Sequence, residues 1–240
     1  MGALTLTGTV YLVPNLLGAV PPSHALPHRT IDIARNLVHW IVETPKPARA
    51  FLKALDVAIP IANLDLRTFP TAPTTANLAT LLAPAWEGHD IGLLTDAGCP
   101  GVADPGATVV AAAHGAGIRV VPLVGPSAVL LALMASGMNG QSFVFHGYLP
   151  AKPDARAHTL RALEADSRAH RRAELFIETP YRNVAMLEAI SQTLKPTTLL
   201  CVAADLTLPS ETIERRTAAA WRNHDIGRFA KRPALFVMQG

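Results

Sequence analysis

The segment with the strongest chemical signature is Thr95–Gly106, which reads Thr-Asp-Ala-Gly-Cys-Pro-Gly-Val-Ala-Asp-Pro-Gly. Its glycines, among them Gly98 and Gly101, allow the backbone to approach a ligand closely. Its carboxylates, Asp96 and Asp104, can accept hydrogen bonds from ribose hydroxyls or attract an ammonium group. An ordinary turn between a strand and a helix rarely needs so many glycines, prolines and aspartates together. We therefore interpret this segment as a ligand-binding loop.

A second loop, Pro122–Ala128, follows the next apolar run. Ser127 can cap the helix that begins there, or the free amides of that helix can face a polar or anionic group, and the sequence leaves both roles open.

Cys99 has no histidine close to it in the sequence, so we expect a small wall residue rather than a nucleophile. The nine histidines are scattered, with His24 and His28 the close pair, and we expect no metal site.

Other polar side chains follow the remaining apolar runs. Glu43 and Asp205 each stand at the end of such a run. Glu178 and Arg182 flank a helix start, where they form either a structural ion pair or an active-site wall. Lys152 can steer an acidic substrate, although a single lysine is more often only solvated.

The elements that must position these residues alternate between short apolar runs and helical stretches, which indicates an α/β fold with a largely parallel first sheet. In the first part we expect strands at 8–13, 39–43, 59–64, 90–96 and 118–124, with helices up to Val38 and at 46–55, 74–86 and 107–114. Asp104 and Pro105 are typical of a helix start, with Asp104 as the cap.

The second part shows a different spacing, which favours a mixed sheet. Strands are expected at 143–148, 174–178, 198–203, 211–217 and 234–238. A helix follows Gly125–Ser127, another lies between the first two of these strands, and Thr179 caps a third that runs to Leu194. We expect two α/β domains, 1–124 and 125–240, which together form a ligand cleft.

Composition narrows the function classes. The chain has 240 residues, half of them hydrophobic and 16% charged, which excludes a disordered protein. Two cysteines cannot form a disulfide framework, no apolar stretch is long enough to span a membrane, and Met1–Thr5 lacks a cationic leader. We expect a cytoplasmic protein without a membrane segment. The net charge is +3, and the residues after Pro150 carry fourteen basic against ten acidic side chains, a mild excess that a polyanionic partner would fit.

These motifs together resemble the tetrapyrrole methylase family of S-adenosylmethionine-dependent methyltransferases. Within it the chain is most similar to bacterial enzymes that methylate a cytidine ribose 2′-hydroxyl of small-subunit ribosomal RNA, as a divergent paralogue. The resemblance covers nearly the whole chain. It rests on residues 8–14, 96–100, 104–106, 117–126, 147–152, 178–182 and 206–212.

The resemblance implies two α/β domains with the methyl donor between them, usually in a homodimer. The donor contacts that the resemblance implies are Ala97, Gly98, Cys99, Val102, Ser127, Ala128, Ile177, Glu178 and Asp205. We add Asp96, which belongs to the same loop as the first four. The cofactor is S-adenosyl-L-methionine.

The chain departs from the ribosomal enzymes at three places. Their Thr-Pro-Ile-Gly-Asn-Leu loop is replaced by Val13–Ala19, and their Glu-Asp-Thr-Arg by Glu43–Lys46. Their His-Asn-Glu segment has no counterpart around 67–75. The donor-side motifs are thus better kept than the acceptor-side motifs, which predicts methyl donation and leaves the acceptor open.

Our leading hypothesis is a methyltransferase that aligns an acceptor for in-line displacement at the sulfonium methyl. A hydroxyl acceptor also needs a proton acceptor, for which Glu43 and Glu178 are the candidates. Lys152 and Arg182 would position an anionic partner, either ribosomal RNA or a small anionic acceptor. The alternatives are a small-molecule methyltransferase acting on a tetrapyrrole-like compound and a donor-binding protein without catalysis.

Overall fold

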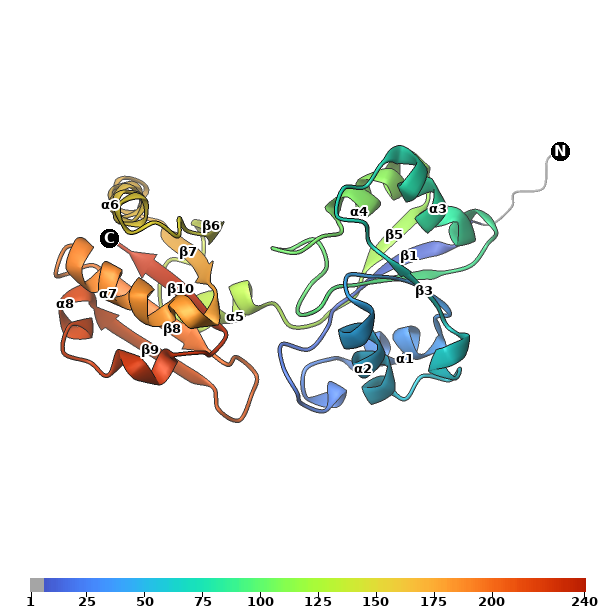
Figure 1. The fold of residues 1–240 in the computed structure, drawn as a ribbon, viewed down its shortest axis with the longest axis horizontal. Helices are drawn as coiled ribbons and strands as arrows, with labels where there is room; N and C mark the ends of the chain where they lie inside the picture. The colour runs from blue at the N-terminus through green and yellow to red at the C-terminus, as the bar shows by residue number, and fades with distance from the viewer. Residues whose placement is uncertain (1–6) are drawn as a thin grey trace. The chain divides into compact units, whose positions relative to one another are not determined.

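The computed structural model describes residues 7–240, and the Met1–Thr5 segment lies outside the described residues. The chain divides after Ser127 into a first unit and a second unit, Ala128–Gly240 (Figure 1). Each unit is built around its own five-stranded sheet. The boundary expected after Val124 falls in the segment just ahead of Ser127.

The sheet of the first unit is parallel throughout, with the order β3-β2-β4-β1-β5. Consecutive strands are not all neighbours, because the chain crosses over through helices between them. The α/β class and the parallel first sheet are confirmed. The strands are β1 Thr9–Val13, β2 His39–Val42, β3 Asp65–Thr68, β4 Ile91–Leu94 and β5 Arg119–Pro122.

Helices cover both faces of this sheet, so the first unit has three layers. Leu52 of one helix pair lies in a core with Trp40 and Leu94, whereas Leu82 of the other pair lies in a separate core with Ile41 and Leu93. The first pair is α1 His28–Asn36 and α2 Pro45–Leu55, and the second is α3 Thr75–Trp86 and α4 Ala107–Gly115. Short 3-10 turns span Pro22–His24 and Ile61–Asn63.

Strand β4 is buried along its whole length at the centre of the sheet. Successive side chains of a strand point to opposite faces, and Gly92 therefore shares its face with Leu94. A Cβ at position 92 would lie 2.5 Å from ring atoms of Trp40, which is paired with Gly92 on the neighbouring strand β2. The glycine leaves room for the indole, whose Nε1 donates to the Leu37 carbonyl at 3.1 Å.

We expect Gly92→Ala to lower the free energy of unfolding by about 2 kcal/mol, because the added methyl must displace a fully buried indole. Chemical denaturation of the purified protein measures this loss. Gly115→Ala is the matched control, since nothing lies within 4 Å of a Cβ at that helix end. Equal stability of the two variants would contradict the packing described for Trp40.

The expected strand at 59–64 is wrong. Residues Ile61–Asn63 form a 3-10 turn after Pro60, and β3 lies further on, at Asp65–Thr68. The prediction followed the apolar residues of 59–64, whereas the edge strand that forms, β3, is largely polar. Asp65 of β3 instead accepts hydrogen bonds from His39 and from Arg67, at 2.9 and 2.8 Å.

The sheet of the second unit is mixed, as expected, with the order β6-β7-β10-β8-β9. Strands β6 and β7 pair in parallel and the other pairs are antiparallel. The strands are β6 Phe143–Tyr148, β7 Ala173–Glu178, β8 Leu199–Ala204, β9 Thr212–Thr217 and β10 Ala234–Gln239.

One face of this sheet carries the larger core, where Phe176 and Phe236 stack with ring centroids 5.4 Å apart. The helices of that face supply Leu160, Ile190 and Trp221. The helices of the unit are α5 Ala128–Ser136, which packs against β8, β9 and β10, then α6 Pro153–His170, α7 Asn183–Thr193 and α8 Ala218–Trp221, with 3-10 turns at Pro180–Arg182 and Ile226–Phe229.

The continuous helix expected from Pro180 to Leu194 is corrected. A 3-10 turn, Pro180–Arg182, comes first, and α7 begins at Asn183. Thr179 makes no side-chain capping bond. Its backbone N–H instead donates to the Glu178 carboxylate at 2.6 Å.

Candidate functional site

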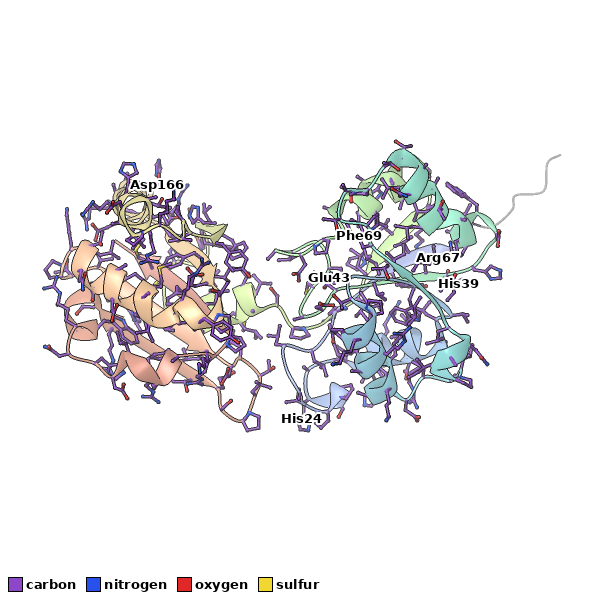
Figure 2. The ribbon with its side chains drawn as sticks, in the orientation of Figure 1. His24, His39, Glu43, Arg67, Phe69 and Asp166 are labelled. Atoms are coloured by element: carbon purple, nitrogen blue, oxygen red, sulfur yellow. The ribbon has the colours of Figure 1, made fainter. Side chains whose placement is uncertain are left out.

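Four loops meet at the carboxyl edge of the first sheet, where the parallel strands β1, β2, β4 and β5 all end. Ligands of open α/β sheets bind outside this edge, because the loops there can surround them. Figure 2 shows Glu43 at this end of β2 and His39 at the opposite end of the same strand. The first-unit residues predicted from sequence, Glu43 and the 95–106 loop, lie at this edge.

Asn15 fastens the loop after β1 to the loop after β4, and sequence reasoning missed it. Its side-chain amide donates to the carbonyls of Thr95 and Asp96, at 2.9 and 3.0 Å, and its backbone N–H donates to the Gly98 carbonyl at 2.8 Å. Asn15 itself is buried. The available signal in the sequence was a polar residue directly after the proline that follows the first apolar run. The 95–106 loop is therefore held in place before any ligand binds.

Glu43 and Asp96 hold the loops after β2 and β4 together. The Asp96 N–H donates to Glu43 Oε2 at 3.0 Å, and the Thr44 N–H donates to Asp96 Oδ1 at 3.2 Å. One oxygen of each carboxylate is therefore engaged by a backbone amide of the other loop. The structure brings together two side chains that the sequence analysis assigned to different roles.

Asp104 completes a group of three carboxylates. Burial of Asp104, together with the negative charges of Glu43 and Asp96, raises its pKa from 3.8 to about 6. The expectation that Asp104 caps the next helix is wrong: α4 begins at Ala107 after Gly106, and no side chain caps it. The group of carboxylates gives this edge a negative potential that favours a cationic ligand.

The backbone of the 95–106 loop has a conformation that depends on its glycines. Gly98, Gly101 and Gly106 have φ angles of 67°, 80° and 129°, and Ala103 joins them at 64°. Residues other than glycine rarely adopt these backbone angles. Gly98 is buried, and a Cβ there would lie 3.5 Å from Leu17, in contact with the loop after β1.

Cys99 is half-buried and joins two loops of the first unit. Its thiol donates to the Pro126 carbonyl at 3.4 Å, which links the 95–106 loop to the loop after β5. Burial and the charge of Asp104 raise the pKa of the Cys99 thiol, which makes it a poor nucleophile near neutral pH. Ala97 and Val102 of the same loop are exposed, as contacts with a ligand require.

A cavity of about 480 Å³ opens beside this loop. Asp96 and Asn15 supply polar groups, and most of the remaining wall is apolar. The apolar wall comes from the loop after β1 and from α2, and consists of Leu16, Leu17, Ala19, Val20, Pro21, Pro47, Ala50, Phe51 and Ala54. A flat, weakly polar group would fit such a wall.

In the second unit, Glu178 and Arg182 form an ion pair. Glu178 Oε1 lies 2.6 Å from an Arg182 terminal nitrogen and 2.8 Å from its Nε. The side chain of Glu178 is fully buried, and its other oxygen, Oε2, has no hydrogen-bond partner among residues 7–240. A buried acceptor without a donor costs free energy, so Oε2 marks a place where a ligand hydrogen can bind.

Asp205 follows β8 with a left-handed backbone, φ 52°. Its Oδ2 accepts from Arg232 Nε and from the Ser210 hydroxyl, each at 2.8 Å. The Pro180 carbonyl accepts from the Lys231 N–H at 3.0 Å, which joins the Arg232 segment to the turn after β7. Asp205 is thus part of a structural network near the end of the strand that precedes it.

The remaining predicted residues occupy simpler positions. Ile177 is half-buried next to Glu178, and Lys152 is exposed at the N-cap of α6. Ser127 ends the first unit, and Ala128 begins α5 in the second.

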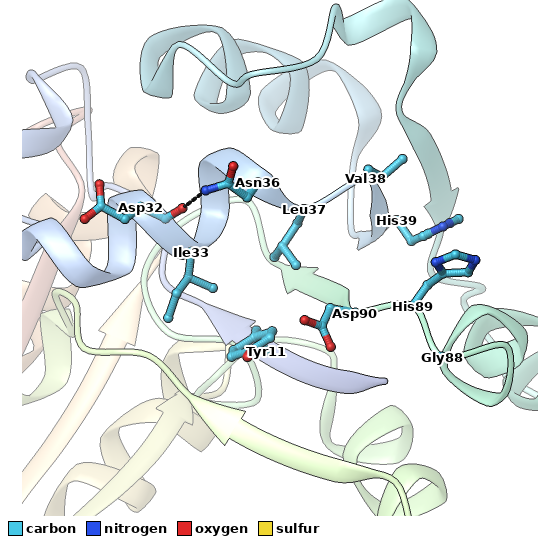
Figure 3. Close-up of a pocket in the computed structure, with 10 residues that line it drawn as sticks. All are labelled: Tyr11, Asp32, Ile33, Asn36, Leu37, Val38, His39, Gly88, His89 and Asp90. Carbon is cyan, nitrogen blue, oxygen red and sulfur yellow. Dashed lines mark hydrogen bonds between the residues drawn. The ribbon is translucent and has the colours of Figure 1, made fainter. Parts of the chain in front are cut away.

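A larger cavity, about 690 Å³, lies at the amino edge of the first sheet, and no predicted site residue lines it (Figure 3). His39 and His89 lie there with ring centroids 5.1 Å apart, and Tyr11 and Asp90 also line the cavity. Strands of four residues separate the two edges by about 13 Å.

In residues 7–240 no cluster of side chains is arranged to hold a metal ion, and no helix has both the length and the apolar character to cross a membrane.

Solved structures show which fold the chain has. The methyltransferase CobJ matches 98% of this chain and 95% of its own, with a TM-score of 0.64 and 19% identity. The uroporphyrin-III-C-methyltransferase of Thermus thermophilus matches 97% and 92%, with a TM-score of 0.57 and 21% identity. At these identities the likeness shows the fold alone, which is the tetrapyrrole methylase fold.

Sequence relatives define the family. "Ribosomal RNA small subunit methyltransferase I" of Escherichia coli O157:H7 is 38% identical over 97% of this chain and 78% of its own length. The protein of the same name from Xylella fastidiosa Temecula1 is 30% identical over 96% and 80%. No family model matches the chain. The chain belongs to the ribosomal RNA small subunit methyltransferase I family and is a methyltransferase, which confirms the resemblance found in its sequence.

Proposed function

We propose that the protein transfers the methyl group of S-adenosylmethionine to a ribose 2′-hydroxyl of small-subunit ribosomal RNA. The observation that carries the donor assignment is the group of three carboxylates, Glu43, Asp96 and Asp104, around a glycine-rich loop at the carboxyl edge of the first sheet. The donor carries a sulfonium and an ammonium group, and both are attracted by this negative site.

The loop contributes shape as well as charge. Gly101 is exposed and gives a ligand access to the backbone of the loop, and Ala97, Val102 and the half-buried Cys99 contribute to its surface. We assign the donor to this loop, and Ser127 of the same unit is a further predicted contact. For the second unit the resemblance of the sequence predicts donor contacts at Ala128, Ile177, Glu178 and Asp205, and of these Glu178 has the unpaired acceptor Oε2, which would take a hydrogen from an amino or hydroxyl group.

When bound, S-adenosylmethionine supplies an activated methyl group that needs no further chemical activation. The residues of the chain must therefore align the acceptor, exclude water and remove one proton from the acceptor hydroxyl. One carboxylate oxygen of Glu43 accepts a hydrogen bond from the Asp96 amide, and the charge of Glu178 is neutralised by Arg182. Asp104, with a pKa of about 6, is a stronger base than an ordinary carboxylate and is still ionised at neutral pH, and we assign it the role of proton acceptor.

The acceptor assignment follows the names of the relatives, which act on small-subunit ribosomal RNA. The mild positive charge of the second half and the cationic Lys152 are compatible with RNA. A protein that acts on ribosomal subunits would work in the cytoplasm, and we propose a homodimer as its assembly. The small-molecule alternative has support only from the fold of the tetrapyrrole enzymes.

The test is incubation of the protein with methyl-labelled S-adenosylmethionine and small ribosomal subunits lacking this modification. We expect label in the RNA at a nucleotide whose 3′ bond resists alkaline hydrolysis, as a 2′-O-methyl group requires. Label on a base, or label in a porphyrinoid but not in RNA, would refute the proposed acceptor. Donor binding without transfer to any acceptor would favour a binding protein.

Donor affinity should depend on pH in a stated direction. Above about pH 6 the Asp104 carboxylate is charged and attracts the donor, and below it the group is protonated and neutral. We therefore expect the dissociation constant of S-adenosylmethionine to rise as the pH falls from 8 through 6, measured by calorimetry. Affinity that is constant over this range would contradict a role for Asp104 beside the donor.

A further inference from the structure

Arg156 is a buried cation without a counter-ion. It lies in the first turn of α6, is 7% exposed, and makes no ion pair with any carboxylate of residues 7–240. Its Nε is buried and has no hydrogen-bond partner among the same residues. A buried Nε–H of a guanidinium without an acceptor costs free energy, so it indicates a place where a ligand can bind.

Arg156 lines a cavity of about 230 Å³ between α6 and α7, which are the yellow and orange helices of the second unit (Figure 1). The cavity adjoins the N-terminus of α6, an 18-residue helix. No side chain caps this helix end, and Pro153 occupies its first position. The amides of a helix start and its dipole attract anions, which adds to the charge of Arg156.

The rest of the cavity wall indicates which anion would fit. Asp154 and Glu188 line it with exposed carboxylates, and Gln192 and Thr193 add neutral polar groups. Two carboxylates oppose a highly charged anion, but they accept hydrogen bonds from hydroxyl groups. A phosphodiester has a single negative charge, and in RNA the adjacent ribose carries a hydroxyl. The wall thus complements a ribonucleotide of a strand.

We propose that Arg156 and the N-terminus of α6 bind a backbone phosphate of the RNA acceptor, with Asp154 and Glu188 facing an adjoining ribose. The proposal rests on the proposed function for the nature of the strand. It places an RNA contact in the second unit, on α6 and α7. Arg156 is a positioning residue for the acceptor and takes no part in the chemistry.

Arg156→Met tests this with a fluorescein-labelled oligocytidine RNA and anisotropy at a series of salt concentrations. Each phosphate contact releases counterions, so we expect about tenfold weaker binding and a log–log salt dependence that is less steep by about one. Arg161→Gln, an exposed arginine of the same helix, is the matched control and should keep the wild-type salt dependence. A wild-type salt dependence in Arg156→Met overturns the proposal.

Three further measurements separate this role from a structural one. Arg156→Met should melt at or above the wild-type temperature without RNA, since it removes an unpaired buried charge; a clearly lower melting temperature together with unchanged RNA binding would make Arg156 structural only. Arg156→Lys keeps the charge in a shorter side chain and should restore the steeper salt dependence. Calorimetric affinity for S-adenosylmethionine should be the same in all variants. Absence of methyl transfer by the wild type would refute the proposed function, whereas the oligonucleotide result tests Arg156 on its own.

Discussion

Gly98→Trp should abolish detectable binding of S-adenosylmethionine, measured by calorimetric titration. Gly98 has a φ of 67°, and the first atom of any side chain there would lie 3.5 Å from Leu17, beside the surface on which we place the donor. Because Gly98 is buried, an indole at this position must displace Leu17 and would enter that surface. Asn15 and the Glu43–Asp96 contacts hold the rest of the loop, so the loop cannot easily move away.

The control for this variant is Gly117→Trp. Gly117 has nearly the same backbone conformation, φ 69°, but nothing lies within 4 Å of its Cβ position and it is outside the carboxyl edge. Both variants carry the same left-handed strain, of about 1 kcal/mol. Gly117→Trp should therefore bind the donor as the wild type does. Equal affinity of the two variants would show that the donor does not lie against Gly98.

Asp104→Asn should lower the rate of methyl transfer to RNA by at least about 100-fold at saturating donor, because the amide cannot accept the proton of the hydroxyl. In the wild type, kcat/KM should fall below about pH 6, the pKa of Asp104 in the free protein. The variant should lack this inflection. A full rate in Asp104→Asn would exclude Asp104 as the proton acceptor.

Asp104→Asn should also stabilise the folded protein, because it removes a charge that burial and two neighbouring carboxylates make unfavourable. The folded-state pKa of Asp104 is raised, so its contribution to stability is complete below pH 3.8 and is lost as the pH rises through about 6. After allowance for solvent screening, we expect Asp104→Asn to unfold with about 1 kcal/mol more free energy at pH 8 and with no gain at pH 4. Asp32→Asn, an exposed carboxylate on α1, should change neither rate nor stability.

Sequence reasoning predicted the central elements and the loop because their signals are local. Strand β4 is a continuous apolar run, α2 begins at paired prolines, and the 95–106 loop is dense in glycine and aspartate. These features depend on residues close together in the chain. The parallel first sheet then follows from the alternation of strands and helices.

The parts that sequence reasoning missed depend on contacts between distant segments. The polar strand β3 is defined by its pairing with β2 and by the contacts of Asp65 with His39. The raised pKa of Asp104 comes from burial and from Glu43, which follows a different strand. The burial of Arg156 without a partner likewise depends on how α7 packs against α6. No local pattern contains this information.

The most direct measurement is a crystal structure of the protein with S-adenosylhomocysteine, the demethylated product of the donor. We expect its amino acid part beside Asp96 and Asp104, against the backbone of Ala97–Val102. Density for the ligand in the histidine-lined cavity at the amino edge, next to His39 and His89, would contradict the account.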